Sequence, residues 1–168
     1  MLASVGLHPE IVAADVDETP LPGEAPIPYA LRVATSKANA ILDPRPVLAA
    51  DTVVALDGRI LAKAEDPDDA VRMIRELSGR WHAVHTAVVL RGERTLSDLV
   101  TTEVRFRDLS DAEIRRYVDT REPMDKAGAY GIQGEGGALV AEVRGSYTNV
   151  VGLPLEETLR LLQLMGLA

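Results

Sequence analysis

The pattern of apolar and polar positions predicts strands where apolar residues run together without a helical period. These runs cover residues 10–16, 47–56, 81–90, 95–107 and 138–144. The run at 47–56 does not alternate, which is typical of a strand covered on both faces. Turn signals follow two of the runs, Asp-Gly at 57–58 and Arg-Gly at 91–92, so neighbouring strands should pair as hairpins. The hairpins argue against an all-parallel sheet.

Helices are predicted between these strands. Apolar residues at helical spacing indicate a helix over residues 29–42. Asp66 followed by a proline starts a second helix, which ends at the Ser-Gly pair at 78–79. Ser110 and Glu113 form a capping box for a third helix that runs to about residue 119. The last helix covers residues 155–165. We therefore expect a single α/β domain over residues 1–168, with a mixed twisted sheet flanked by helices.

Composition narrows the classes of function. The 168 residues carry 18 Lys and Arg against 26 Asp and Glu, a formal charge of -8, which argues against sequence-independent nucleic-acid binding. The absence of cysteine excludes disulfides, thiolate zinc sites and a cysteine nucleophile, and is compatible with a reducing compartment. No apolar run has membrane-spanning length and no secretory leader is recognised, so we expect a cytoplasmic protein without membrane partners.

The basic residues are unevenly divided. Fifteen are Arg, and the three lysines are Lys37, Lys63 and Lys126. Chance is one explanation. The other is that these positions need a compact ammonium, such as one that meets a phosphate as a point charge.

Asp51 stands in the middle of an apolar strand. Burying a carboxylate there costs several kcal/mol unless something compensates the charge. The residue could be a structural acid paired with an arginine. It could instead be a general base or metal ligand whose pKa is tuned by burial.

Two other stretches could complete such a site. Asp15, Asp17 and Glu18 follow the first predicted strand, either as a solvated loop or as Mg²⁺ ligands beside a phosphate. Five glycines lie within residues 128–137, either as a flexible hairpin or as a loop that lets backbone N–H groups approach a ligand. Gln133 in this loop has an amide that can both donate to and accept from a nucleobase edge.

Several common catalytic motifs are absent from the sequence: it contains no P-loop, no His-Glu-x-x-His and no Gly-x-Ser-x-Gly. His82 and His85 are three residues apart on a predicted strand, so they face opposite ways and are interpreted as structural. The residues favour metal-assisted phosphoanhydride chemistry on an anionic substrate.

At these positions the chain resembles the Maf family of nucleotide pyrophosphatases, which is related in fold to the inosine triphosphate pyrophosphatases. The resemblance rests on stretches in family order that span nearly the whole chain. They are residues 15–18 (Asp-Val-Asp-Glu), 36–38 (Ser-Lys-Ala), 50–54 (Ala-Asp-Thr-Val-Val), 60–63 (Ile-Leu-Ala-Lys), 77–80 (Leu-Ser-Gly-Arg), 125–134 (Asp-Lys-Ala-Gly-Ala-Tyr-Gly-Ile-Gln-Gly) and 145–154 (Gly-Ser-Tyr-Thr-Asn-Val-Val-Gly-Leu-Pro).

The resemblance implies hydrolysis of a nucleoside triphosphate to the monophosphate and pyrophosphate with a divalent metal, Mg²⁺ or Mn²⁺. It implies that Asp51 is the proton acceptor. It also implies that the carboxylates of Glu18 and Asp51 bind the metal ion. The family's phosphate-facing lysines match Lys37, Lys63 and Lys126, and its positions linked to base choice match Thr52 and Gln133. The Thr/Gln pair resembles the branch that prefers dTTP and UTP. A homodimer is also implied.

The chain departs from the family pattern at its beginning. The family starts with a strand and a Ser-x-Ser-x-Arg-Arg loop that leads into a first helix. Residues 1–8 align best with the last turn of that helix, so we expect the first strand, most of the first helix and the Arg pair to be absent. Because lysine does not replace bidentate arginine, weaker activity is expected than for an extended chain. A smaller departure is alanine at 64, where the family has proline.

Two alternatives stay open at this point. The chemistry could be the same with a purine or 7-methyl-GTP as substrate. The protein could also be a non-catalytic nucleotide-binding regulator of septum formation, a role associated with the family name.

Overall fold

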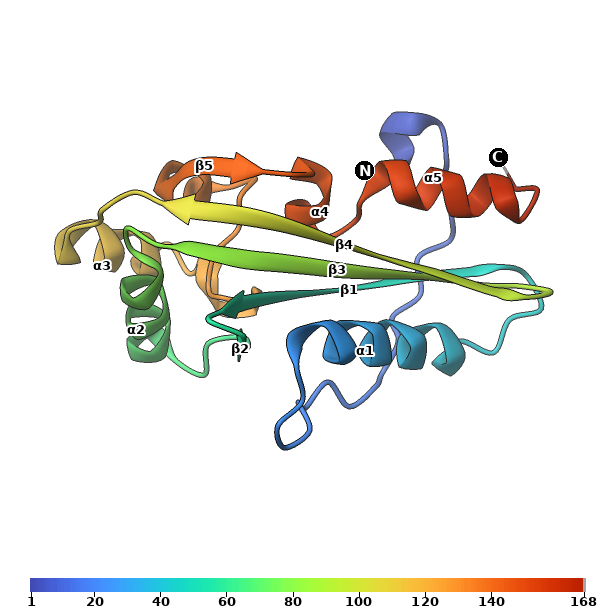
Figure 1. The fold of residues 1–168 in the computed structure, drawn as a ribbon, viewed down its shortest axis with the longest axis horizontal. Coiled ribbons are helices and arrows are strands. Elements are labelled where there is room, and N and C mark those ends of the chain that lie inside the picture. Colours follow the sequence, from blue (N-terminus) through green and yellow to red (C-terminus); the bar gives the residue numbers. More distant parts are fainter. Residues whose placement is uncertain (168) are drawn as a thin grey trace.

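A computed structural model describes residues 1–167 and contains a five-stranded sheet with helices on both faces (Figure 1). The strands are β1 (Val47–Leu56), β2 (Arg59–Leu61), β3 (Trp81–Arg91), β4 (Thr95–Phe106) and β5 (Val140–Arg144). Their order is β2-β1-β3-β4-β5, and every pairing in this sheet is antiparallel. The predicted α/β fold with a helix-flanked sheet is confirmed, as are the hairpin turns. The sheet, expected to be mixed, is antiparallel at every described pairing, because β3 pairs with β1 and not with β2, the strand to which it runs parallel.

The helices also follow the predicted signals. They are α1 (Pro26–Ala40), α2 (Pro67–Leu77), α3 (Asp111–Asp119), α4 (Tyr147–Val151) and α5 (Leu155–Leu164). The Asp66 side chain accepts a hydrogen bond from the Asp69 N–H, and the capping box of α3 is present. Helix α1 begins three residues earlier than predicted because proline suits the first helical position. None of the described helices is long and apolar enough to cross a membrane.

The strand predicted over residues 10–16 is wrong. This segment is irregular, and Ile11 and Val12 are 94% and 53% exposed. A strand needs a neighbour for its backbone N–H and C=O groups, and no described strand pairs with this segment. The run of apolar residues was therefore a misleading signal. The segment instead leads from a single 3₁₀ turn, η1 (Leu2–Val5), to the loop before α1.

Alternation along the strands divides the core between the two faces of the sheet. Helix α1 packs on one face against Val53, Ala87 and Val89. On the opposite face α5 covers Val88 and Leu90, as the positions of α1 and α5 on the two sides of the sheet in Figure 1 show. The two helices therefore cover the same part of the sheet from opposite sides.

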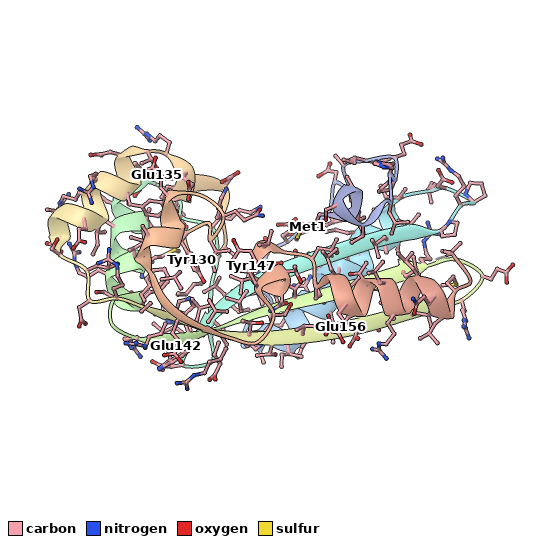
Figure 2. The ribbon with its side chains drawn as sticks, turned by 90° about the horizontal axis from the view of Figure 1, so that it is seen from above. Met1, Tyr130, Glu135, Glu142, Tyr147 and Glu156 are labelled. Atoms are coloured by element: carbon pink, nitrogen blue, oxygen red, sulfur yellow. The ribbon has the colours of Figure 1, made fainter. Side chains whose placement is uncertain are left out.

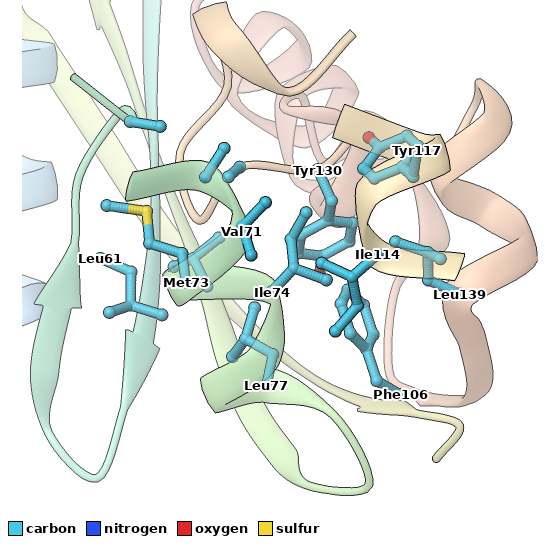
Figure 3. Close-up of a cluster of buried hydrophobic side chains, with 14 of the residues drawn as sticks. Leu61, Val71, Met73, Ile74, Leu77, Phe106, Ile114, Tyr117, Tyr130 and Leu139 are labelled. Carbon is cyan, nitrogen blue, oxygen red and sulfur yellow. The ribbon is translucent and has the colours of Figure 1, made fainter. Parts of the chain in front are cut away.

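The largest apolar cluster joins α2 and α3 to the other end of the sheet. Ile74 and Leu77 from α2 meet Ile114 from α3, with Phe106 and Tyr130 packed beside them (Figure 3). Because Tyr130 belongs to the glycine-rich segment, this cluster anchors that segment to the sheet.

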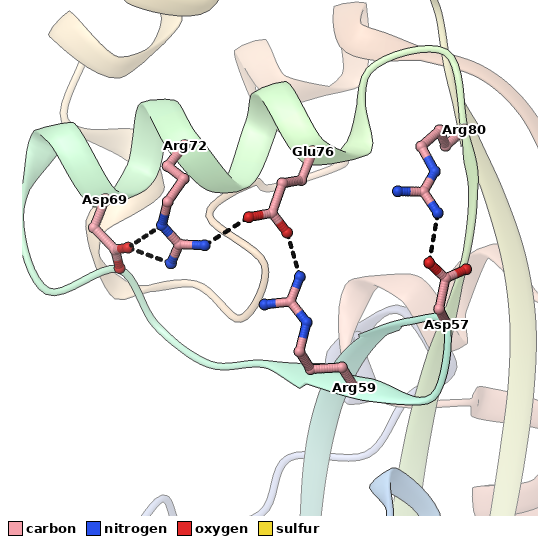
Figure 4. A network of polar contacts seen from close by, with 6 residues as sticks. All are labelled: Asp57, Arg59, Asp69, Arg72, Glu76 and Arg80. Carbon is pink, nitrogen blue, oxygen red and sulfur yellow. Dashed lines mark hydrogen bonds and ion pairs between the residues drawn. The ribbon is translucent and has the colours of Figure 1, made fainter.

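Ion pairs tie the β1–β2 hairpin to α2 and to the turn that follows it (Figure 4). Arg59 on β2 pairs with Glu76, which also accepts from Arg72 at 2.7 Å. Asp57 in the hairpin turn pairs with Arg80 at 2.6 Å. Single exposed pairs contribute little to stability. Together they orient the short strand that precedes Lys63.

Candidate active site

All the predicted site residues line one cavity of about 800 Å³. They are Glu18, Lys37, Asp51, Thr52, Lys63, Lys126 and Gln133. The cavity lies at β1, whose edge away from β3 pairs with β2 at Val54 to Leu56 only. Because residues 47–53 have no strand neighbour on that side within the described chain, the cavity reaches both faces of the sheet at this edge.

Asp51 is buried in the cavity wall on the same face as α1. Its carboxylate is 8% exposed, and its Oδ1 accepts a hydrogen bond of 2.8 Å from Lys37 Nζ. Its Oδ2 is buried and has no hydrogen-bond partner among the described residues. Burial raises the pKa of Asp51, and the Lys37 ammonium opposes this only in part. The acid is thus held close to a cation while one oxygen stays free.

Lys37 joins two carboxylates. Besides Asp51 it pairs with Glu18 Oε1 at 2.7 Å, and Lys63 lies 3.4 Å from Glu18 Oε2. The hydrogen bond from Lys37 lowers the pKa of Glu18. Burial acts to lower the pKa of Lys37, but its bonds to the two carboxylates outweigh burial and raise it. One ammonium therefore holds both carboxylates in a single ion-paired cluster.

Tyr29 is a site residue that the sequence analysis did not single out. It lines the cavity, and its hydroxyl donates to the Glu18 backbone carbonyl at 2.8 Å. Burial, with the nearby Asp51 charge, raises the pKa of Tyr29. It stands at the start of the helix predicted over residues 29–42, and no local motif marks its hydroxyl as part of a site.

Lys63 and Lys126 approach the cavity from neighbouring loops. A bridge pairs Lys63 with Ala127, and the Gly128 N–H donates to the Leu61 carbonyl at 3.0 Å. Lys126 Nζ pairs with Asp125 at 2.8 Å in this structure. The backbone pairing explains why residues more than sixty positions apart present ammonium groups to the same space.

The glycine-rich loop is held in place by Glu122, which the sequence analysis missed. Its carboxylate accepts from the backbone N–H groups of Glu135 and Gly136 and from the Tyr117 hydroxyl, at 2.9–3.0 Å. A Cβ at Gly134 would overlap with Glu122 Oε2. Figure 2 shows Tyr130 and Glu135, which mark this segment. The sequence offered one signal for this role. Glu122 precedes the glycine-rich stretch, whose backbone N–H groups need acceptors once that stretch is folded.

The two residues linked to base choice lie in different parts of the cavity wall. Thr52 is on the sheet face opposite Asp51, and its hydroxyl is 2.8 Å from the Thr86 hydroxyl. Gln133 is exposed on the glycine-rich loop. Both side chains are thus available to a ligand in the cavity.

Other candidates lie outside the cavity. Asp15 and Asp17 do not line it, and Asp17 accepts from the Thr19 N–H in an exposed turn. His82 is hydrogen bonded to the Tyr130 hydroxyl and His85 to the Thr101 hydroxyl, both at 2.8 Å. The acidic stretch therefore contributes only Glu18.

Glu18 and Asp51 provide the oxygen ligands that a cation such as Mg²⁺ prefers, when substrate oxygens complete its coordination. The described residues contain no cluster of three or more His, Cys, Asp or Glu side chains arranged to hold a metal ion. Mg²⁺ needs only one or two carboxylates when phosphate oxygens and water supply the rest. Asp51 Oδ2, buried and without a partner, is an oxygen suited to that role.

Comparisons with known proteins match nearly the whole chain. The family described as Maf-like protein matches residues 1–165. A protein of Anaeromyxobacter dehalogenans named dTTP/UTP pyrophosphatase is 56% identical over 99% of this chain and 88% of its own length. Proteins with the same name from Chromobacterium violaceum and Myxococcus xanthus are each 49% identical over 99% of this chain, covering 88% and 87% of their own lengths.

Proposed function

The chain belongs to the Maf family, and from this premise we propose that it hydrolyses dTTP and UTP to the monophosphate and pyrophosphate. One observation carries the proposal. A buried carboxylate with a free oxygen, Asp51, opens onto the cavity in which the three lysines of the chain meet. Ammonium groups suit a triphosphate, and a base close to them suits attack by water.

In the proposed reaction Asp51 takes a proton from the attacking water. The water oxygen bonds to the α-phosphorus, the bond from that phosphorus to the bridging oxygen breaks, and pyrophosphate leaves with the electron pair. Lys63 and Lys126 neutralise the negative charge of the leaving group, since their side chains are more exposed to the cavity than that of Lys37. Lys37 favours the ionised form of Asp51 through their 2.8 Å contact, against the effect of burial.

Glu18 and Asp51 would hold a divalent cation. When bound, such a cation neutralises phosphate oxygens and favours attack at phosphorus. Without the cation, Lys37 pairs with both carboxylates and keeps them near each other.

The experiment measures pyrophosphate release from dTTP, UTP, dCTP, dGTP, ITP and 7-methyl-GTP with Mg²⁺ or Mn²⁺. We expect dTTP and UTP to be the preferred substrates. Preference for 7-methyl-GTP or ITP would favour the purine alternative. Nucleotide binding without any hydrolysis would favour the non-catalytic regulator.

Asp51→Asn tests the assigned base. We expect the rate of pyrophosphate release to fall by about 10²–10⁴-fold, because the amide cannot take the proton. The thermal midpoint should change little, since Lys37 keeps its pair with Glu18 and is not left as an uncompensated charge. Asp57→Asn makes the same chemical change in the exposed hairpin turn, outside this cavity, and should retain activity. Equal activity in the two variants would refute the role of Asp51.

A homodimer, implied by the family, and a cytoplasmic location, expected from the sequence, belong to the same proposal. Light scattering coupled to size-exclusion chromatography tests the first, and a monomer at assay concentration would rule it out.

A further inference from the structure

Beneath Thr52 lies a buried chain of hydrogen bonds that ends at α4. Thr52 on β1 pairs across the strands with Thr86 on β3, with their hydroxyl oxygens 2.8 Å apart. Thr86 is fully buried, and its hydroxyl donates to the Asn149 backbone carbonyl at 2.9 Å. That carbonyl also accepts from the Gly152 N–H at 2.9 Å. The chain therefore runs from the cavity wall to the first turn of a helix.

The protons of this chain can be assigned from its chemistry. A hydroxyl has one proton to donate and two lone pairs that accept. A carbonyl oxygen only accepts, so the Thr86 hydroxyl donates its single proton to the Asn149 carbonyl. In the contact between the two threonines Thr86 is thus the acceptor and Thr52 the donor. The Thr52 proton points into the protein, and its oxygen can only accept from a ligand in the cavity.

The backbone carbonyl of Asn149 is held in place beside Thr86 by further hydrogen bonds. Its side-chain amide is buried and donates to the Val84 carbonyl at 3.0 Å and to the Thr102 hydroxyl at 2.9 Å. Thr102 in turn donates to the Ser146 carbonyl. These bonds fix the backbone of α4, and with it the carbonyl that orients Thr86.

We propose that Thr86 is a positioning residue for base specificity, because it fixes the Thr52 hydroxyl as an acceptor for a ring N–H. The inference rests on the proposed function and names the base edge that this site takes. Gln133 cannot by itself discriminate between bases, since its amide can rotate by half a turn and present either the donor or the acceptor. A hydroxyl that can only accept discriminates between a base that donates and a base that accepts at the same position.

The matching edge is an imide, with an N–H between two carbonyl groups. Uracil and thymine have this edge, whereas cytosine has an acceptor nitrogen at the same ring position. An acceptor-only Thr52 therefore opposes the cytosine ring nitrogen, because two lone pairs face each other. A freely rotating hydroxyl could donate to cytosine and would tolerate both bases.

The test measures the ratio of the Kd values of non-hydrolysable UTP and CTP analogues by calorimetry, together with the ratio of kcat/KM for UTP and CTP. In Thr86→Val the Thr52 hydroxyl loses its acceptor and can rotate. We expect the preference for uracil to fall by about tenfold, mainly through better use of the cytosine nucleotide. Thr86→Ser keeps the hydroxyl and should keep the wild-type ratio.

Thr158→Val is the matched control. Thr158 is equally buried, and its hydroxyl donates to the Pro154 carbonyl outside the cavity. Its loss should lower stability without changing the base preference. A folded Thr86→Val protein with the wild-type ratio would overturn the inference. If Thr86→Val does not fold, Thr52→Val decides, since an unchanged ratio there would also overturn it.

Binding separates this inference from the proposed function. A protein that prefers the uracil nucleotide in binding but releases no pyrophosphate would refute the proposed function and leave the inference standing. A protein that releases pyrophosphate from both nucleotides and binds them equally would refute the inference and leave the hydrolytic activity standing.

Discussion

Lys37 is the residue on which the charge state of the cavity depends. Its ammonium lies within 2.8 Å of both Glu18 and Asp51, so it stabilises two carboxylates that would otherwise repel each other. Burial raises the pKa of Asp51, and Lys37 is the strongest influence in the opposite direction. A base in this position must be deprotonated to act, so the pH range of the reaction depends on this contact.

Lys37→Met should shift the acid limb of the kcat/KM profile to higher pH. A nearby cation lowers a carboxyl pKa by one unit or more, so its removal should move the limb upward by about one to two pH units. The profile is measured by pyrophosphate release at constant ionic strength. Lys126→Met is the comparison, because Lys126 pairs with Asp125 and not with Asp51. It should weaken substrate binding and leave the acid limb in place; the same shift in both variants would contradict the assignment.

At the scale of elements, the glycine-rich loop is attached to the β1–β2 hairpin at Gly128. This residue has a φ of +68°, and its N–H donates to the carbonyls of Leu61 and Ala62. A Cβ on it would stand 2.8 Å from Val54 Cγ1. The position therefore demands glycine for two reasons, the left-handed backbone and the close approach to β1.

Gly128→Ala should destabilise the protein more than Gly58→Ala. Gly58 has a similar φ of +77° but open space around the added Cβ, so it reports the backbone cost alone, about 1 kcal/mol. The contact with Val54 should add about 1–3 kcal/mol at Gly128. Urea denaturation measures both values. Val54→Ala in the same chain should recover part of the extra loss, and equal costs at the two glycines would show that the loop is not pressed against β1.

At the scale of the whole molecule, buried histidines connect stability to pH. His82 packs edge-on against Phe106 and Tyr130, and burial lowers its pKa from 6.5 to about 4. Between these values the unfolded chain binds more protons than the folded protein, so stability decreases as pH falls. Burial also lowers the pKa of His85, with the same sign. Carboxylates with lowered pKa values, such as Glu113 at about 2, act in the same direction at lower pH.

The free energy of unfolding of the wild-type protein should therefore fall by up to about 3 kcal/mol between pH 6.5 and pH 4 because of His82. In His82→Phe the ring packing is retained and this part of the pH dependence disappears, although the Tyr130 hydroxyl loses its partner. Urea denaturation across the pH range gives the two slopes. His8→Gln, at an exposed position, should keep the wild-type slope. Parallel curves for wild type and His82→Phe would show that His82 is not buried in its neutral form.

The sequence predicted local features well where local forces decide them. The caps at Asp66 and Ser110 and the turn at residues 57–58 are formed by neighbouring residues, and the structure confirms all three. The strand expected at residues 10–16 failed because strand formation depends on a partner elsewhere in the chain. The resemblance to the family supplied the cavity residues in advance, but not the contacts among them.

The contacts that organise the site were decided by the tertiary structure. Glu122 holds amides thirteen and fourteen residues away, and Thr86 reaches Asn149 across 63 positions. Periodicity, capping and turn chemistry act over a few residues and can be read from the chain alone. The direction of a buried hydroxyl proton depends on which acceptor the folded backbone brings beside it, so only the complete fold shows that Thr52 presents lone pairs to the cavity.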